Sequence, residues 1–399
     1  IVERRIYSRH NDGEIAPFII NFEAGSMIAK LIQHQFYPES PFDLFTLRLR
    51  GTQIEIGEDL ARVAQEHHDV DLTATPIAET DLQAQQRLLS RYCPVLVERA
   101  AGVANYFGRD RQALYPYSLP LVQEPPPFAC SAAFLGEKNG GFLVRNFDFT
   151  LRSFPELLGA TVAEARPMID PVYLMTIEPE TGFRSIAVVA TDLFTSAFDG
   201  INDRGFCIAL LAVSNGAAQF VEPGFDAFDE ITVPRILLES CATVEEAIAL
   251  FSAMPKQTVF IPCHYIIGDR NGNAAVLEWN ETSGIGIVRR EKSQPLLCTN
   301  HYLSSLHHAI AKEGHEEESR QRLVTLGSHL HKDLDDDQGL WRAAEAVRIS
   351  ALDEDGSIIG GTLWTALYRT ALPGLDIHFL KQAKGKDTVY SQAYSARFD

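Results

Sequence analysis

The chain has 399 residues, of which 46% are hydrophobic and 22% charged, the balance of an ordinary globular protein rather than a fibrous or disordered one. Its formal net charge is -18, and no basic run offsets it, which argues against nucleic acid as a partner because a phosphate backbone would be repelled. No apolar run is long enough to span a bilayer.

The cysteines are scattered, with neither a CxxC pair nor the spacing to histidine of a zinc site. The six are Cys93, Cys130, Cys207, Cys241, Cys263 and Cys298. We therefore expect no metal, no disulfide framework and no organic cofactor. The sequence begins with Ile1 rather than Met, which is compatible with the removal of a leader peptide. The cellular location is therefore unknown, with the cytoplasm favoured.

The first third of the chain is expected to be rich in helices. Apolar residues recur at helical spacing in 24–36 and again in 82–104, where Pro94 would divide the helix. Between these segments, Phe45–Leu49 alternates like a strand. It leads into a helix whose start carries a capping box of Thr52 and Glu55.

A short strand that begins at Cys130 follows this helical segment. The prolines at 125–127 hold the chain extended before it, and a glycine-containing turn returns it as a second strand. This hairpin would bring Arg145 and Asp148 back beside Cys130. A nearby guanidinium favours a thiolate, although a buried structural cysteine explains the same residues.

Strands predominate after this hairpin, and many of them are joined by turns. An Asn-Gly turn at 271–272 and a capping box of Thr243 and Glu246 mark a further hairpin and a helix, and another helix is expected to begin near Glu317. Such grouping indicates antiparallel sheets covered by helices, an α+β fold. The predicted strands are Val172–Ile177, Ser185–Ala190, Phe206–Leu211, Tyr265–Gly268, Ala274–Glu278, Leu296–His301, Thr362–Tyr368 and Leu375–Phe379.

Several short motifs occur in a recognisable order between about Gly51 and about Phe379. They are Cys130 followed by Arg145-Asn146-Phe147-Asp148, the Gly-x-Asn-x-x-Gly string around Asn202, Thr299-Asn300-His301, and the Ser-x-x-Arg spacing that ends at Arg322. In this order they resemble the choloylglycine hydrolases and the acyl-coenzyme A:aminopenicillanate acyltransferases. The resemblance implies the four-layered αββα sandwich of N-terminal-nucleophile hydrolases. We predict a helix-rich pro-segment or subdomain at 1–129 and a catalytic αββα domain at 130–399.

The resemblance also implies that Cys130 is the nucleophile and becomes a chain terminus by cleavage of the Ala129–Cys130 bond. Its α-amino group, with a reference pKa near ~8, would then act as general base for its own thiol. Asn202, with a backbone N–H, would hold the oxyanion. We expect Asn202 to lie on a sharp turn at 199–205, and asparagine is also common in turns for conformational reasons alone.

The remaining residues would surround the nucleophile. Arg145 would lie near the thiol, Asp148 would hold the α-ammonium or a substrate amide, and Asn300 would lie close to Cys130. Arg322 fits the family spacing, with Arg320 as the fallback if the register slips; a solvated helix arginine explains either one equally well.

The sequence thus predicts a self-processing cysteine amidase or acyltransferase that cleaves a linear, non-peptide carbon–nitrogen amide. Phenylalanines in 194–198 and 220–228 suggest a small-molecule amide with an apolar acyl group, although core packing explains them as readily. One alternative is an uncleaved, non-catalytic relative that serves as a binding module. Another is a cysteine peptidase that uses His264 or His301. The acyl acceptor and a homo-oligomeric state stay open.

Overall fold

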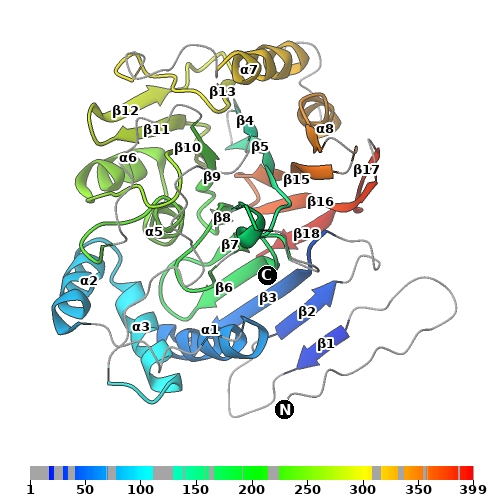
Figure 1. Cartoon of the computed structure of the whole chain (residues 1–399). Coiled ribbons are helices and arrows are strands. Elements are labelled where there is room, and N and C mark those ends of the chain that lie inside the picture. The colour runs from blue at the N-terminus through cyan, green and yellow to red at the C-terminus, as the bar shows by residue number, and fades with distance from the viewer. Residues whose placement is uncertain are drawn as a thin grey trace, which may run out of the picture.

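The computed structural model describes a large part of the chain in two facing sheets with helices on the outside (Figure 1). The described residues are 18–21, 30–34, 41–68, 70, 78–110, 129–137, 140–157, 159–160, 166–190, 192–213, 224–307, 316–330, 337–353, 356, 358–384 and 387–398. The prolines at 125–127 lie outside this set, as do residues 220–223.

The first sheet has ten strands in the order β1-β2-β3-β6-β7-β8-β9-β10-β11-β12. Its neighbours pair antiparallel except β3 and β6, which run parallel. The strands are β1 (Phe18–Asn21), β2 (Lys30–His34), β3 (Leu44–Gly51), β6 (Val172–Pro179), β7 (Ser185–Ala190), β8 (Asp199–Asn202), β9 (Cys207–Ala212), β10 (Cys263–Gly268), β11 (Ala274–Asn280) and β12 (Gly284–Arg289).

The second sheet has eight strands, in the order β13-β4-β5-β15-β16-β17, with β14 paired to β15 and β18 paired to β16. The strands are β4 (Ala129–Glu137), β5 (Gly140–Thr150), β13 (Leu296–Cys298), β14 (Ser350–Leu352), β15 (Ile358–Arg369), β16 (Gly374–Lys384), β17 (Asp387–Tyr390) and β18 (Tyr394–Arg397).

Helices cover the outer face of each sheet. On the ten-stranded sheet lie α5 (Thr232–Ser240) and α6 (Val244–Ala253), and on the eight-stranded sheet lie α7 (Glu317–Leu330) and α8 (Asp337–Glu345). The sheets contact each other through β4, β5 and β16 on one side and β8, β9 and β10 on the other. The four layers confirm the predicted αββα sandwich. The inner strands are apolar along their length because both of their faces are covered.

The N-terminal helices pack beside the ten-stranded sheet. They are α1 (Gln53–His68), α2 (Glu79–Tyr92) and α3 (Val95–Tyr106); a short helix, α4 (Phe154–Leu157), follows β5. The backbones of α1 and α3 are in direct contact at Gly57 of α1 and Gly102 of α3. No side chain fits there: a Cβ at Gly102 would lie 1.9 Å from the carbonyl oxygen of Ile54. The boundary at residue 129 stays a prediction.

Local capping signals from the sequence are confirmed. Thr52 N donates to the Glu55 carboxylate at 2.8 Å and Glu55 N donates to Thr52 Oγ1 at 3.3 Å. Thr243 and Glu246 form the same reciprocal box on α6. Pro94 separates α2 from α3, as expected.

Two local expectations were wrong. Lys30–His34 is a strand, where a helical pattern was expected over 24–36, and residues 22–29, 35 and 36 lie outside the described part. Pairing of β2 with β3 accounts for this change, because strand pairing readily overrides a weak local pattern. Asp199–Asn202, expected as part of a turn, pairs as β8 between β7 and β9.

Candidate active site

Cys130 lies at the beginning of β4, an inner strand of the eight-stranded sheet. It faces Phe147 of β5 in the ladder, and its side chain is buried with 2% exposure. The predicted hairpin of β4 and β5 is confirmed and brings the Arg145-to-Asp148 segment back along the cysteine strand.

Arg145 is fully buried next to the Cys130 thiol. Its Nη2 lies 3.7 Å from Cys130 Sγ and donates to Leu210 O at 2.6 Å, while Nη1 donates to the Asp199 carboxylate. Burial alone would lower the pKa of Arg145, but Asp199 and the thiol raise it overall. The guanidinium therefore stays charged within the sandwich.

Asp199 was missed in the sequence analysis. Its carboxylate also accepts from Trp364 Nε1 at 2.9 Å and from Tyr368 Oη at 2.6 Å, so three side chains converge on it. A buried guanidinium needs a carboxylate partner. The sequence carried that requirement but not the identity of the partner, which is 54 residues away along the chain.

Burial works against ionisation of the Cys130 thiol. Burial raises its pKa, and Arg145 offsets only part of that rise. The loss of solvation therefore outweighs the effect of the nearby guanidinium on this pKa. Attack by this sulfur therefore requires a base.

Asn300 and Arg322 hold the peptide groups on both sides of the Cys130 Cα. Asn300 Oδ1 accepts from Cys130 N at 2.7 Å, and Arg322 Nη1 donates to Cys130 O at 2.6 Å. Arg322 Nη2 also donates to Asn300 Oδ1 at 2.8 Å. Arg320 instead pairs with Glu316 at the surface, so of the two arginines it is Arg322 that contacts the cysteine.

Asp148 approaches the same region from β5. It pairs with Ala129 in the ladder, and its Oδ1 accepts from Thr362 Oγ1 at 2.6 Å. Among the described residues Oδ2 has no hydrogen-bond partner, although the side chain is fully buried. Burial raises the pKa of Asp148 to about 6. An unpaired buried carboxylate oxygen beside a thiol is available to hold a proton or an ammonium group.

Asn202 does not join these residues. Its Nδ2 donates to the carbonyls of Leu238 and Cys241, and its Oδ1 accepts from the N–H groups of Arg204 and Phe206. It is the last residue of β8, beside the start of β9, whereas Arg145 contacts Leu210 and Asn300 contacts Ala212 further along β9, roughly 10 and 17 Å from Cys207 at strand rise. The side chain of Asn202 is thus engaged with backbone groups and is not among the residues that line the cavity at Cys130.

A narrow cavity opens beside Cys130. Its volume is about 30 Å³, room for one or a few water molecules, since roughly 10–15 Å³ on this measure holds one. Cys130 and Asp148 are on its wall, and the remaining lining is apolar side chains and one further thiol, that of Cys263. The aromatic lining residues are Phe147, Phe149, Phe198 and Phe260.

The histidines considered for a cysteine–histidine pair have other partners. His264 Nε2 donates to Thr299 O at 2.6 Å, and His301 Nδ1 contacts Ser319 Oγ at 2.8 Å. In the described part of the chain neither makes a hydrogen bond to Cys130, so the geometry does not favour the peptidase alternative. Across the same residues, no group of three or more His, Cys, Asp or Glu side chains could hold a metal ion.

The raised pKa of Asp148 predicts a pH effect on stability. The folded chain holds this proton more tightly than the unfolded chain, whose carboxyl has a pKa near ~3.9. The stabilising contribution is therefore complete below that value and is lost as the pH rises to about 6. In a Cys130→Ala background, Asp148→Asn is expected to remove this loss, which is worth ~3 kcal/mol above pH ~6.

Urea unfolding at several pH values between 4 and 8 measures the difference between the two chains. Their free energies of unfolding should diverge as the pH rises through this window, with the asparagine chain the more stable above it. A constant difference at every pH would contradict the assignment.

The two antiparallel-rich sheets and their covering helices form the four-layered αββα fold of the N-terminal-nucleophile hydrolases, with a buried cysteine near the start of an inner strand. The profile of the acyl-coenzyme A:6-aminopenicillanic acid acyl-transferases matches residues 135–384. The chain belongs to this family. The match begins five residues after Cys130 and includes Arg145, Asp148, Asn300 and Arg322.

The chain is also similar to two solved proteins at low identity. Penicillin V acylase from Agrobacterium tumefaciens is 15% identical with a TM-score of 0.44, covering 63% of this chain and 82% of the acylase. A variant of the conjugated bile acid hydrolase from Clostridium perfringens is 10% identical with a TM-score of 0.44, covering 68% of this chain and 97% of the hydrolase. A second variant of the same hydrolase is 10% identical with a TM-score of 0.41, covering 67% of this chain and 97% of the hydrolase.

No curated protein matches the chain. Within the described residues, no helix combines the length and the apolar character needed to cross a bilayer.

Proposed function

We propose that this protein is a self-processing cysteine amidase or acyltransferase that uses Cys130 as its nucleophile. The observation that carries the proposal is the support around Cys130. Its backbone N–H is held by Asn300 and its carbonyl by Arg322, while its thiol lies at an apolar cavity. After cleavage of the Ala129–Cys130 bond, Asn300 Oδ1 would hold the new α-amino group where it now holds the amide.

Self-cleavage would proceed by an N-to-S acyl shift. Cys130 Sγ attacks the Ala129 carbonyl carbon, the C–S bond forms, the C–N bond breaks, and the thiol proton passes to the departing nitrogen of Cys130. Asp148 Oδ2, buried on the cavity wall and without a partner among the described residues, is our candidate to relay that proton. Water then hydrolyses the thioester and leaves a carboxylate on Ala129 and a free thiol and amine on Cys130.

The mature residue would repeat this chemistry on a substrate. The α-amine takes the thiol proton, the sulfur attacks the amide carbonyl, and the resulting α-ammonium protonates the leaving amine. Water or another amine then accepts the acyl group. Asn300 is our candidate oxyanion donor in place of Asn202, because its amide carries two N–H groups and its Nδ2 lies 2.7 Å from the carbonyl oxygen of Ala212, a residue that lines the cavity.

The substrate would be a linear, non-peptide amide with an apolar acyl group. The cavity beside the thiol offers aromatic and aliphatic side chains, and Asp148 carries the one carboxyl group among the described lining residues. The family takes its name from the transfer of an acyl group to 6-aminopenicillanic acid, and penicillin V acylase is among the similar structures. Both names support acyl chemistry at an amide nitrogen.

Intact mass and N-terminal sequencing of the purified chain test the proposal. We expect two fragments, one of which begins at Cys130, and we expect that Cys130→Ala yields a single intact chain because the attacking sulfur is missing. Cleavage in Cys130→Ala would contradict self-processing. A wild-type chain that stays whole would favour the uncleaved, non-catalytic alternative.

A further inference from the structure

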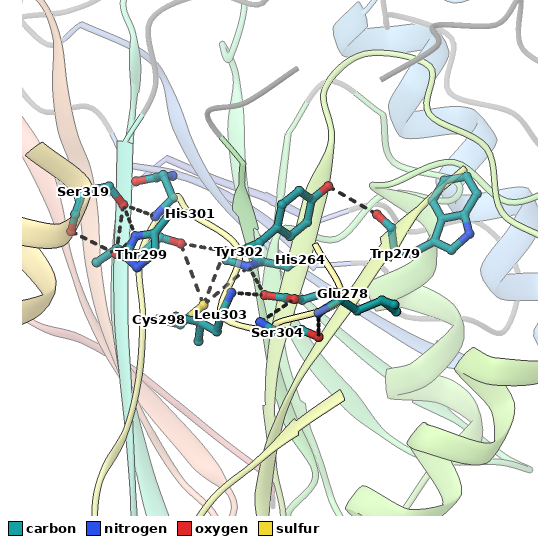
Figure 2. A network of polar contacts seen from close by, with 12 residues as sticks. His264, Glu278, Trp279, Cys298, Thr299, His301, Tyr302, Leu303, Ser304 and Ser319 are labelled. Atoms are coloured by element: carbon teal, nitrogen blue, oxygen red, sulfur yellow. Dashed lines mark hydrogen bonds and ion pairs between the residues drawn. The ribbon is translucent and has the colours of Figure 1, made fainter. Parts of the chain in front are cut away.

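A second buried polar cluster lies next to the active site, and none of its side chains lines the cavity. Figure 2 shows it around the His264 ring, between Glu278 on β11 and Cys298 at the end of β13. His264 and Glu278 are fully buried, as is Cys298. Buried charged groups of this kind are costly unless they are paired, so the cluster calls for an explanation.

The contacts of His264 require a proton on Nε2 and place Nδ1 facing a carboxylate; both nitrogens also contact Cys298 Sγ, at 3.3 Å from Nε2 and 3.9 Å from Nδ1. Nε2 lies 2.6 Å from Thr299 O, which can only accept, so Nε2 must donate. Nδ1 faces Glu278 Oε1 at 3.5 Å. Glu278 in turn accepts from Leu303 N at 2.6 Å and Ser304 N at 3.0 Å, as a carboxylate does.

The electrostatics agree with this protonation. Burial alone would lower the pKa of His264, but Cys298 and Glu278 raise it to about 10 overall. Burial also acts against the charged form of Glu278, yet His264 and the two backbone donors bring the pKa of Glu278 below its usual value. The two side chains therefore form a buried imidazolium–carboxylate pair.

This pair anchors the chain on both sides of Asn300. Cys298 belongs to the eight-stranded sheet, where it pairs with Ala132 of β4. From there the chain crosses to the ten-stranded sheet: His264 of β10 holds Thr299 O, and Glu278 of β11 holds the amides of Leu303 and Ser304. Asn300 lies within the crossing, with Oδ1 on Cys130 and Nδ2 on Ala212.

The crossing is also tied to the helix that carries Arg322. Asn300 N donates to Ser319 Oγ at 2.8 Å, and Thr299 Oγ1 donates to Ser319 O at 3.0 Å. Ser319 lies one helical turn before Arg322 on α7. A displacement of Thr299 would therefore be passed to both groups that hold Cys130.

We propose that His264 and Glu278 are positioning residues for the active site, a buried charged pair that fixes residues 299–304 and so holds Asn300 and Arg322 on Cys130. This inference rests on the proposed function for its effect on the reaction. Its structural part, the hold on the Cys130 amide, is independent of whether the chain cleaves.

The first experiment compares self-cleavage rates in His264→Gln, Glu278→Gln and the double variant. A lone glutamine at 264 leaves the Glu278 charge buried without its partner, so we expect cleavage to slow roughly 10-fold to 100-fold, the range for residues that orient catalytic groups. The double variant buries no charge, and its amides can still serve Thr299 O and the amides of Leu303 and Ser304. It should recover most of the rate.

His378→Gln is the matched control, because His378 is a half-buried strand histidine that contacts Ser391 O on the outer part of the eight-stranded sheet. It should cleave at the wild-type rate. With 4-nitroanilides of phenylacetic and hexanoic acid as substrates, the cleaved His264→Gln enzyme should lose kcat with little change in KM, since the cavity lining is untouched.

The second experiment needs no reaction. In the Cys130→Ala chain, hydrogen exchange at the amide of residue 130 reports the bond to Asn300 Oδ1, and His264→Gln should accelerate it at least tenfold. Unchanged exchange, or cleavage within twofold of wild type in a normally folded His264→Gln chain, would overturn the positioning role. Failure of the wild-type chain to cleave would instead contradict the proposed function and leave the exchange result to decide this inference.

Discussion

Replacing Asn300 with leucine is expected to slow both self-cleavage and amide turnover by roughly 10²-fold to 10³-fold. Leucine keeps the volume but removes the acceptor for Cys130 N and the donor to Ala212 O. The amine would then lose its anchor and the oxyanion its proposed donor. Cleavage is measured by gel over time, and turnover of acyl 4-nitroanilides by absorbance.

Asn202→Ala is the informative comparison for this prediction. Its amide is fully engaged with backbone groups at the other end of β9. We expect it to lower the free energy of unfolding by about 1–3 kcal/mol through the unpaired backbone groups left behind, with little change in turnover by the folded enzyme. A large loss of kcat in Asn202→Ala and none in Asn300→Leu would reverse the two assignments.

The fragment of residues 1–129 is expected to stay bound after cleavage, and Arg99→Met is expected to weaken that association by ~3–5 kcal/mol. Strand β3 is paired within the ten-stranded sheet along its whole length, so cleavage does not free it. Arg99 of α3 is buried, and its guanidinium donates to Glu239 of α5 at 2.8 Å and to Gln53 of α1 at 2.6 Å. With methionine at position 99, the Glu239 carboxylate would keep, among the described residues, only the longer ion pair with Arg235, whose Nη1 lies 3.4 Å from Glu239 Oε1.

Size-exclusion chromatography of the cleaved protein in increasing urea measures this association. The two fragments should elute together without denaturant and separate at a lower urea concentration in Arg99→Met than in wild type. Arg87→Met, at an exposed position of α2, is the control and should behave as wild type. Separation of the wild-type fragments without urea would show that 1–129 is a dissociating pro-segment.

Local features of this protein could be predicted from its sequence. The capping boxes at Thr52 and Thr243, the split at Pro94 and the β4–β5 hairpin are confirmed because each depends on residues close in the chain. The order of the motifs also indicated the sandwich and the family. The spacing favoured Arg322, with Arg320 kept as a fallback.

Contacts between residues far apart in the chain could not be read from local sequence. Asp199, 54 residues from Arg145, is paired with it by sheet packing. The contact from Arg322 to Cys130 O joins residues 192 positions apart. The same long-range packing separated Asn202 from the thiol, although its motif looked as persuasive as that of Asn300. Hydrogen bonds between residues close in the chain depend on the local sequence, so they can be predicted from it. Contacts between the two sheets depend on how the strands pack in three dimensions.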